Sequence, residues 1–386
     1  MNFNEVINRL NTGSIKWEMN KEIYGTNDVL PMWIADMDFR PPQELIDAVQ
    51  ERVEHGIFGY TFVRPSVNEA IQSWLASRHG WTIDQSWLAY ASGVVPAIAA
   101  AVQAYTEPGD KVLVQPPVYN PFFEMIEANG RMVETSPLVL KNGRYEIDFA
   151  DFEDAIKKGC KLFLLCSPHN PGGRVWTKDE LERLANLCGK YDCIIVSDEI
   201  HSDIIFKGRS HVPIANISED IADRTVTFIA PSKTFNLGGI QAAAAIIPND
   251  GLRKKFKEAQ NMQGFKTLNT FAAVTTEAAY LYGATWLEAL LEYIEGNVSF
   301  VRDFLKNNLP AVKLIEPDAT YLLWLDCREL LLSDEEIQRR LIEKGKLALE
   351  PGKKYGQGGE GFVRMNIACP RDVIEDGLGR LKKAFD

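Results

Sequence analysis

The sequence predicts an α/β protein whose large domain is a mostly parallel sheet covered by helices on both faces. Between about residue 85 and residue 250, short apolar stretches alternate with helical ones, a pattern typical of parallel sheets. The apolar stretches are nearly continuous, as in strands that are buried on both faces. Beyond residue 308 the order of short strands and helices changes, which indicates a smaller α+β domain.

The 386 residues are enough for two domains, and we divide the chain into three parts. Residues 1–45 are an N-terminal arm and part of the small domain, 46–285 the large domain, and 286–386 the small C-terminal domain. The arm is expected to be irregular and to wrap over a domain or a partner subunit. Its Asp36 and Asp38 suit either a carboxylate pair for acid–base chemistry or a turn with a local hydrogen bond, and we favour the turn.

Composition excludes some classes of partner. The formal net charge of −11 argues against nucleic acid and against anionic membranes, because both attract basic surfaces. No apolar run is long enough to span a bilayer, and the first residues show no apolar signal core. We therefore expect a cytoplasmic protein whose six cysteines are reduced and buried.

Local signals predict several helix starts and turns. Ser66 with Glu69, and Thr177 with Glu180, have the spacing of a capping box at a helix N-terminus. Lys141–Arg144, with the sequence Lys-Asn-Gly-Arg, is typical of a tight hairpin turn.

Three apolar strands deliver Asn170, Asp198 and Lys233, in chain order, at or just beyond their carboxyl ends. Ligands of open α/β sheets bind at that edge. A lysine that ends a buried strand loses solvation, which lowers its pKa towards that of a nucleophilic amine. A lone Ser-Lys pair is more often a surface charge, so the combination carries the prediction.

This set of residue types suits pyridoxal phosphate (PLP). Lys233 can form a Schiff base, Asp198 can hold the pyridine nitrogen, and Asn170 can bind the ring hydroxyl. Gly93, in a small turn before an Ala-rich helix, offers an anion site, although a plain helix start explains the turn equally well. Arg364, in an apolar strand, is expected to bind a substrate carboxylate unless it faces outward.

Three motifs carry a resemblance to a known family: Ser-Pro-His-Asn-Pro-Gly-Gly at 167–173, Ser-Asp-Glu-Ile-His at 197–201, and Ala-Pro-Ser-Lys-Thr-Phe-Asn-Leu at 230–237. They resemble the PLP enzymes of the aspartate aminotransferase fold (fold type I, class I/II aminotransferases). The chain looks most like the branch of cystathionine β-lyases, the cysteine-S-conjugate carbon–sulfur lyases. The resemblance extends from the segment 33–39 to the segment 362–368.

The resemblance implies further roles. Tyr119, on a loop at the ligand edge, would stack on the cofactor and take part in catalysis, although a core-packing tyrosine is the alternative. His201 stands where many transaminases carry a tyrosine, and it would lie at the cofactor. Tyr60 would reach the cofactor phosphate of a neighbouring subunit, which implies a homodimer. The phosphate itself would be bound by Gly93, Val94, Val95 and Ser232.

The expected activity is β-elimination from L-cystathionine or another cysteine conjugate to pyruvate, ammonia and a thiol. Gln241 and Ala230 stand where many transaminases have a phosphate-binding arginine and a serine. No second arginine for a dicarboxylic substrate is identifiable, which disfavours an aspartate transaminase. Two alternatives remain open: a PLP-dependent aminotransferase, and a non-catalytic regulatory protein on the same fold.

Overall fold

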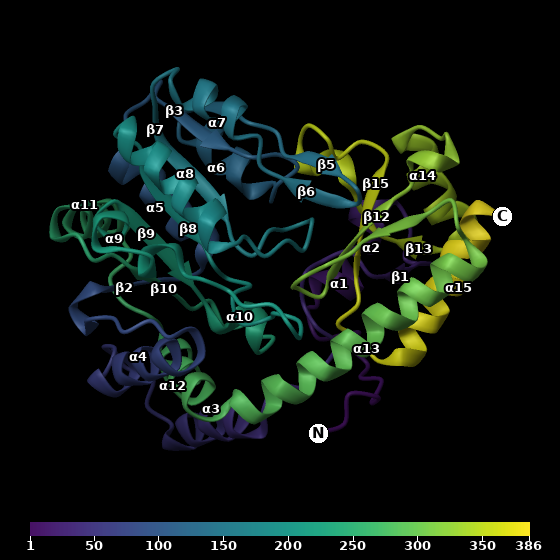
Figure 1. Ribbon diagram of the computed structural model, residues 1–386. Helices are drawn as coiled ribbons and strands as arrows, with labels where there is room; N and C mark the ends of the chain where they lie inside the picture. The colour runs from purple at the N-terminus through teal and green to yellow at the C-terminus, as the bar shows by residue number, and fades with distance from the viewer.

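The computed structural model describes all residues from 1 to 386 and is built around a large and a small β-sheet (Figure 1). All strands of the large sheet run in one direction except β10, which is antiparallel to both of its neighbours. The mostly parallel sheet predicted from the sequence is therefore confirmed. In spatial order its seven strands are β2 (Leu88–Ala91), β10 (Ala243–Ile246), β9 (Thr225–Ile229), β8 (Ile194–Asp198), β7 (Cys160–Cys166), β3 (Lys111–Val114) and β4 (Met132–Thr135).

The central strands are apolar because both faces of the sheet are covered. Every residue of β9 is buried, and in β7 only Lys161 is exposed. Side chains on one face pack with α5 (Val94–Tyr105), α6 (Pro121–Ala128) and α11 (Asp250–Met262). Side chains on the other face pack with α7 (Phe149–Ile156), α8 (Lys178–Lys190) and α9 (Glu219–Asp223).

The small sheet is antiparallel and lies beside the large one (Figure 1). Its strands in spatial order are β11 (Lys313–Ile315), β12 (Leu322–Asp326), β15 (Phe362–Asn366) and β14 (Glu350–Pro351). The arm joins this part of the molecule through β1 (Leu30–Pro31), which pairs in parallel with β13 (Leu347–Ala348). The division at residues 45 and 285 stays a prediction.

Helices connect and flank the two sheets. Figure 1 shows α13 (Ala284–Asn308) running from beside α12 (Thr270–Tyr282) to beside α15 (Arg371–Phe385). On the large-domain side, α12 packs with α3 (Gln43–His55) and α4 (Pro65–His79). The remaining α-helices are α1 (Ile15–Glu18), α2 (Asn20–Tyr24), α10 (Pro231–Thr234) and α14 (Asp334–Arg340). No helix combines the length and the apolar character needed to cross a membrane.

Of the predicted helix caps and turns, some are confirmed and one is wrong. The capping box of Thr177 and Glu180 is confirmed, and β5 (Val139–Lys141) and β6 (Arg144–Glu146) form the predicted hairpin. The capping box at Ser66 is wrong, because α4 already begins at Pro65 and has no side-chain cap. Proline suits the first helical position, where its missing N–H has no partner to lose.

Candidate active site

A cavity of about 230 Å³ lies at the carboxyl ends of β2, β3, β7, β8 and β9. The chain leaves each of these strands at the same edge of the sheet, so residues far apart in sequence meet there. Nine of the eleven predicted site residues line it: Gly93, Val94, Val95, Tyr119, Asn170, Asp198, His201, Ser232 and Lys233.

The other two predicted residues lie outside this lining. Arg364, buried in β15, is next to it: one guanidinium nitrogen donates to Asn170 Oδ1 at 3.2 Å and another to the Trp33 carbonyl at 2.8 Å. The alternative of an outward-facing arginine is therefore wrong. Tyr60 is fully exposed on the segment between α3 and α4, and it takes no part in the cavity of its own chain.

Sequence reasoning missed several residues of the lining. Ala35 comes from the arm, and its residue type does not signal a site. Cys166 ends β7, and a buried thiol reads as core from sequence. The others are Ser92, Pro96, Ile200, Gly238 and Ala242, most of them within a few residues of a predicted position. Gln241, which stands where many transaminases have a phosphate-binding arginine, also lines the cavity.

The Lys233 amine follows β9 on the short helix α10 and donates to the Ala35 carbonyl at 2.7 Å. Burial, together with the nearby Arg364 cation, lowers the pKa of Lys233 to about 8, although Asp36 and Asp198 oppose the shift. A buried amine with this pKa is partly neutral near pH 7 and can act as a nucleophile or a base.

Asp198 ends β8 and is buried without an ion-pair partner. One carboxylate oxygen accepts the Ile200 amide at 3.2 Å. Burial outweighs this hydrogen bond and raises the pKa of Asp198 to about 7. A buried carboxyl group in this setting ionises readily only when a cation lies beside it.

His201 and Tyr119 are uncharged at neutral pH. Burial lowers the pKa of His201 to about 3, so the imidazole stays neutral, and its buried Nδ1 has no hydrogen-bond partner in the protein. Burial raises the pKa of Tyr119 to about 12, so the phenol keeps its proton. Both side chains therefore offer neutral polar atoms to the cavity.

The loop that carries Asn170 is held by a close backbone approach. Gly173 has a φ of +64°, and a Cβ there would lie 2.8 Å from Cβ of Pro317. The Gly173 carbonyl accepts hydrogen bonds from the amides of Asp318 and Ala319. Glycine permits this contact, which ties the end of β7 to the chain leading into the small sheet.

The polar groups that line the cavity fit PLP. The buried Asp198 has no ion-pair partner and could pair with a protonated ring nitrogen, while the unpartnered His201 Nδ1 is free for a polar ligand. In the same cavity α5 begins after Gly93 without a side-chain cap, so its first amides can bind a phosphate. Lys233 adds an amine that can hold an aldehyde covalently.

Fold and cavity together define a PLP-dependent enzyme of fold type I. Residues 27–381 match the family model for aminotransferase class I and II, and the chain belongs to this family. It is 49% identical to cystathionine beta-lyase PatB of Bacillus subtilis over 100% of both chains. It is 35% identical to the protein MalY of Escherichia coli, covering 99% of this chain and 98% of the relative.

Solved structures agree with this assignment. The crystal structure of cystalysin from Treponema denticola, which contains a pyridoxal 5'-phosphate cofactor, superposes with a TM-score of 0.96 at 37% identity. The match covers 99% of this chain and 98% of cystalysin. The α/β architecture and the family expected from the three motifs are thus confirmed.

Proposed function

We propose that this protein is a PLP-dependent carbon–sulfur β-lyase that cleaves L-cystathionine or a related cysteine S-conjugate to pyruvate, ammonia and a thiol. The observation that carries the proposal is the meeting of Lys233, Asp198 and Asn170 in one cavity beside Arg364. This set suits PLP chemistry on an amino acid. The names of the relatives, cystathionine beta-lyase among them, support a carbon–sulfur bond as the target.

Each predicted residue has a proposed role in holding the cofactor. Lys233 would hold it covalently, Asp198 would face the ring nitrogen, and Asn170 would donate to the ring oxygen. Tyr119 would stack on the ring, and His201 would donate to or accept from it. The phosphate would be bound by Gly93, Val94, Val95, Ser232 and, from a second copy of the chain, Tyr60.

When bound, PLP supplies an electron sink for the electron pair left at the substrate Cα. Arg364 binds the substrate carboxylate with its planar fork, and Asn170, its hydrogen-bond partner, is placed to assist. Lys233 would take the Cα proton of the substrate, and its lowered pKa suits that task. Asp198 would stay ionised beside a protonated ring nitrogen, because that cation would offset the effect of burial.

Elimination then depends on the leaving group. The bond between Cβ and sulfur breaks, and its electron pair leaves with the sulfur as a thiolate. A thiol has a pKa near 8.5, so its anion is a far better leaving group than an alkoxide. Cysteine conjugates are therefore natural substrates for a site that already removes the Cα proton.

The decisive test uses L-cystathionine without any added 2-oxo acid. We expect repeated turnover, with pyruvate and thiol released in equal amounts over many cycles per active site. An aminotransferase would instead convert its cofactor once and stop until a 2-oxo acid is added. A protein that binds PLP but releases neither product would favour the regulatory alternative and contradict the lyase assignment.

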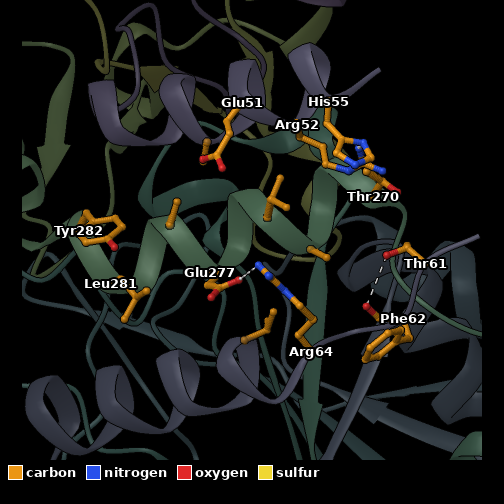
Figure 2. Close-up of a pocket in the computed structure, with 15 residues that line it drawn as sticks. Glu51, Arg52, His55, Thr61, Phe62, Arg64, Thr270, Glu277, Leu281 and Tyr282 are labelled. Carbon is orange, nitrogen blue, oxygen red and sulfur yellow. Dashed lines mark hydrogen bonds and ion pairs between the residues drawn. The ribbon is translucent and has the colours of Figure 1, made fainter. Parts of the chain in front are cut away.

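The homodimer and the cytoplasmic location are also proposals. The exposed segment between α3 and α4 presents four large side chains to solvent: Ile57, Phe58, Tyr60 and Phe62. It borders a groove between α3 and α12, in which Phe62 and Tyr282 lie at opposite ends and Arg64 pairs with Glu277 at 3.0 Å (Figure 2). Such an apolar surface is typical of a contact between subunits.

The proposed cytoplasmic location has a separate basis. Relatives in two bacteria suit a metabolic enzyme of the cytoplasm.

Mixing variants tests whether Tyr60 acts in the neighbouring site. In the proposed dimer, each site takes Lys233 from one subunit and Tyr60 from the other. A hybrid of one Lys233→Ala chain and one Tyr60→Ala chain would therefore contain one intact site. After mixing the two inactive variants equally under exchange conditions, we expect activity in about a quarter of the sites, because half of randomly paired dimers are hybrids.

Mixing Lys233→Ala with Asp198→Ala is the matched control. Both of these residues come from the same chain, so every site in the hybrid keeps one lesion and no activity should return. A fully active monomer, or no recovery in the first mixture, would contradict the proposed role of Tyr60.

A further inference from the structure

The arm segment 33–39 reaches the active-site cavity at Ala35, which lines it, and its backbone contacts two of the site's charged side chains. The Ala35 carbonyl accepts the Lys233 amine at 2.7 Å and the Tyr321 hydroxyl at 3.1 Å. Two residues earlier, the Trp33 carbonyl accepts Arg364 at 2.8 Å. Two carbonyl groups of this short segment, those of Trp33 and Ala35, thus accept hydrogen bonds from the guanidinium and the amine to which the proposed reaction assigns the main tasks.

Four charged side chains hold this segment from the side of the arm, and we name them the arm ion cluster: Arg9, Lys16, Asp36 and Asp38. Arg9 donates to Asp36 at 2.7 and 3.0 Å and to Asp38 at 2.7 Å. Lys16 donates to Asp38 at 2.6 Å, and these two side chains are only 1% and 6% exposed. The favoured turn with a local hydrogen bond does not describe these carboxylates, because both bind cations more than twenty residues away.

Two asparagines hold the same segment from the other side. Asn366, on the strand of Arg364, donates to the carbonyls of Ile34 and Asp36. Asn236, three residues after Lys233, binds the backbone of Met37 at both its amide and its carbonyl. Segment 33–39 therefore bridges the lysine loop and the arginine strand, and the arm ion cluster holds its two carboxylates.

We propose that Asp36 and Asp38 are positioning residues for the reaction, because their ion pairs with Arg9 and Lys16 hold the Ala35 carbonyl on Lys233 and the Trp33 carbonyl on Arg364. A carbonyl accepts only, so the free amine donates an N–H to Ala35 and its lone pair points elsewhere. The cluster thereby orients Lys233 while it is detached from the cofactor. It also fixes one hydrogen bond of the arginine that binds the substrate carboxylate.

Charge adds to this orientation. The charged groups that act on the Lys233 amine are Arg364, which lowers its pKa, and Asp36 and Asp198, which raise it. Neutralising Asp36 removes one anion and loosens the Ala35 acceptor. Both changes disfavour the ammonium form, so the pKa of Lys233 should fall from about 8 to a lower value.

The inference rests on the proposed function for its link to catalysis, and Asp36→Asn tests it. This side chain is 29% exposed, so the variant is expected to fold. The cofactor-free protein is mixed with PLP, and the rate of appearance of visible absorbance is measured against pH. Only the neutral amine adds to the aldehyde, with loss of water. The midpoint of the pH–rate profile therefore reports on the pKa of Lys233. We expect it to move down by about half a pH unit.

A second readout is the split between KM and kcat for the substrate. A less constrained Arg364 should raise KM by about 3- to 10-fold in Asp36→Asn and in Arg9→Gln, with a smaller effect on kcat. If Asp38→Asn fails to fold, the joint replacement Lys16→Met with Asp38→Leu removes both buried charges together and keeps the core filled.

Leu381→Ala is the control for stability. Leu381 is buried in α15, and its truncation should destabilise the protein without touching the cluster. If the cluster variants lower the melting temperature as this control does but leave the PLP-capture midpoint and KM unchanged, the cluster is merely structural and the inference is wrong. A wild-type protein that captures PLP without releasing pyruvate would instead refute the lyase, while the shifted midpoint would still support the cluster.

Discussion

Replacing Lys233 with alanine is expected to lower kcat/KM for β-elimination by at least about 10³-fold, since a positioned general base alone contributes about 10²–10⁴-fold. The same change removes the amine that holds the cofactor covalently, so PLP should be lost on gel filtration. Pyruvate release and the visible absorbance of the filtered protein are the two measurements.

Two controls separate chemistry from structure. Lys233→Arg keeps a cation but has no nucleophilic amine at neutral pH, so it should be as inactive as alanine. Lys254→Ala, on the exposed face of α11, should behave as wild type. Added small primary amines can occupy the space left by the lysine and should restore part of the activity of Lys233→Ala. An alanine variant that keeps wild-type turnover would exclude Lys233 as the base.

The centre of the site could be predicted because the fold brings strand ends together. Asn170, Asp198 and Lys233 each follow an apolar stretch that reads as a fully buried strand. In a parallel sheet the carboxyl ends of such strands share one edge, so sequence order was enough to predict their meeting. The same reasoning placed Tyr119 and Gly93 at the cavity, although their chemical roles stay proposals.

The arm could not be predicted in this way. Ala35 lies at the site because β1 pairs with β13 and because Arg9 and Lys16 pair with carboxylates more than twenty residues away. None of these contacts leaves a periodic pattern in the sequence. Asp36 and Asp38 stand out as a pair of carboxylates in the sequence, but charge alone does not distinguish acid–base chemistry or a turn with a local hydrogen bond from binding to distant cations.

Helix caps show a related limit. Ser66 and Glu69 have the spacing of a capping box as good as that of Thr177 and Glu180, yet only the second pair forms one. Pro65 decides the first case, because its fixed φ starts α4 one residue before the serine can act as a cap. A capping-box spacing therefore does not produce a cap when a neighbouring proline fixes where the helix begins.

Asp198→Asn is expected to lower kcat for β-elimination by about 10²–10³-fold, comparable to the loss of one preorganised electrostatic contact to developing charge. Asparagine keeps the shape but cannot keep a ring nitrogen protonated, which weakens the electron sink. PLP should still bind through Lys233, so the loss should appear in kcat while the cofactor content stays near that of wild type. Unchanged kcat would show that Asp198 does not face the ring nitrogen.

The stability of the cofactor-free protein gives an independent check on Asp198. Its pKa is raised from 3.8 to about 7, so between these pH values the folded state binds a proton that the unfolded state has released. The contribution of Asp198 to stability therefore falls as pH rises through this window. Denaturant unfolding at pH 5 and pH 8 should show that wild type loses stability relative to Asp198→Asn over this interval. PLP should reverse the penalty in wild type only, because the ring cation stabilises the buried anion; equal slopes in both proteins would mean that the carboxyl group is already ionised without the cofactor.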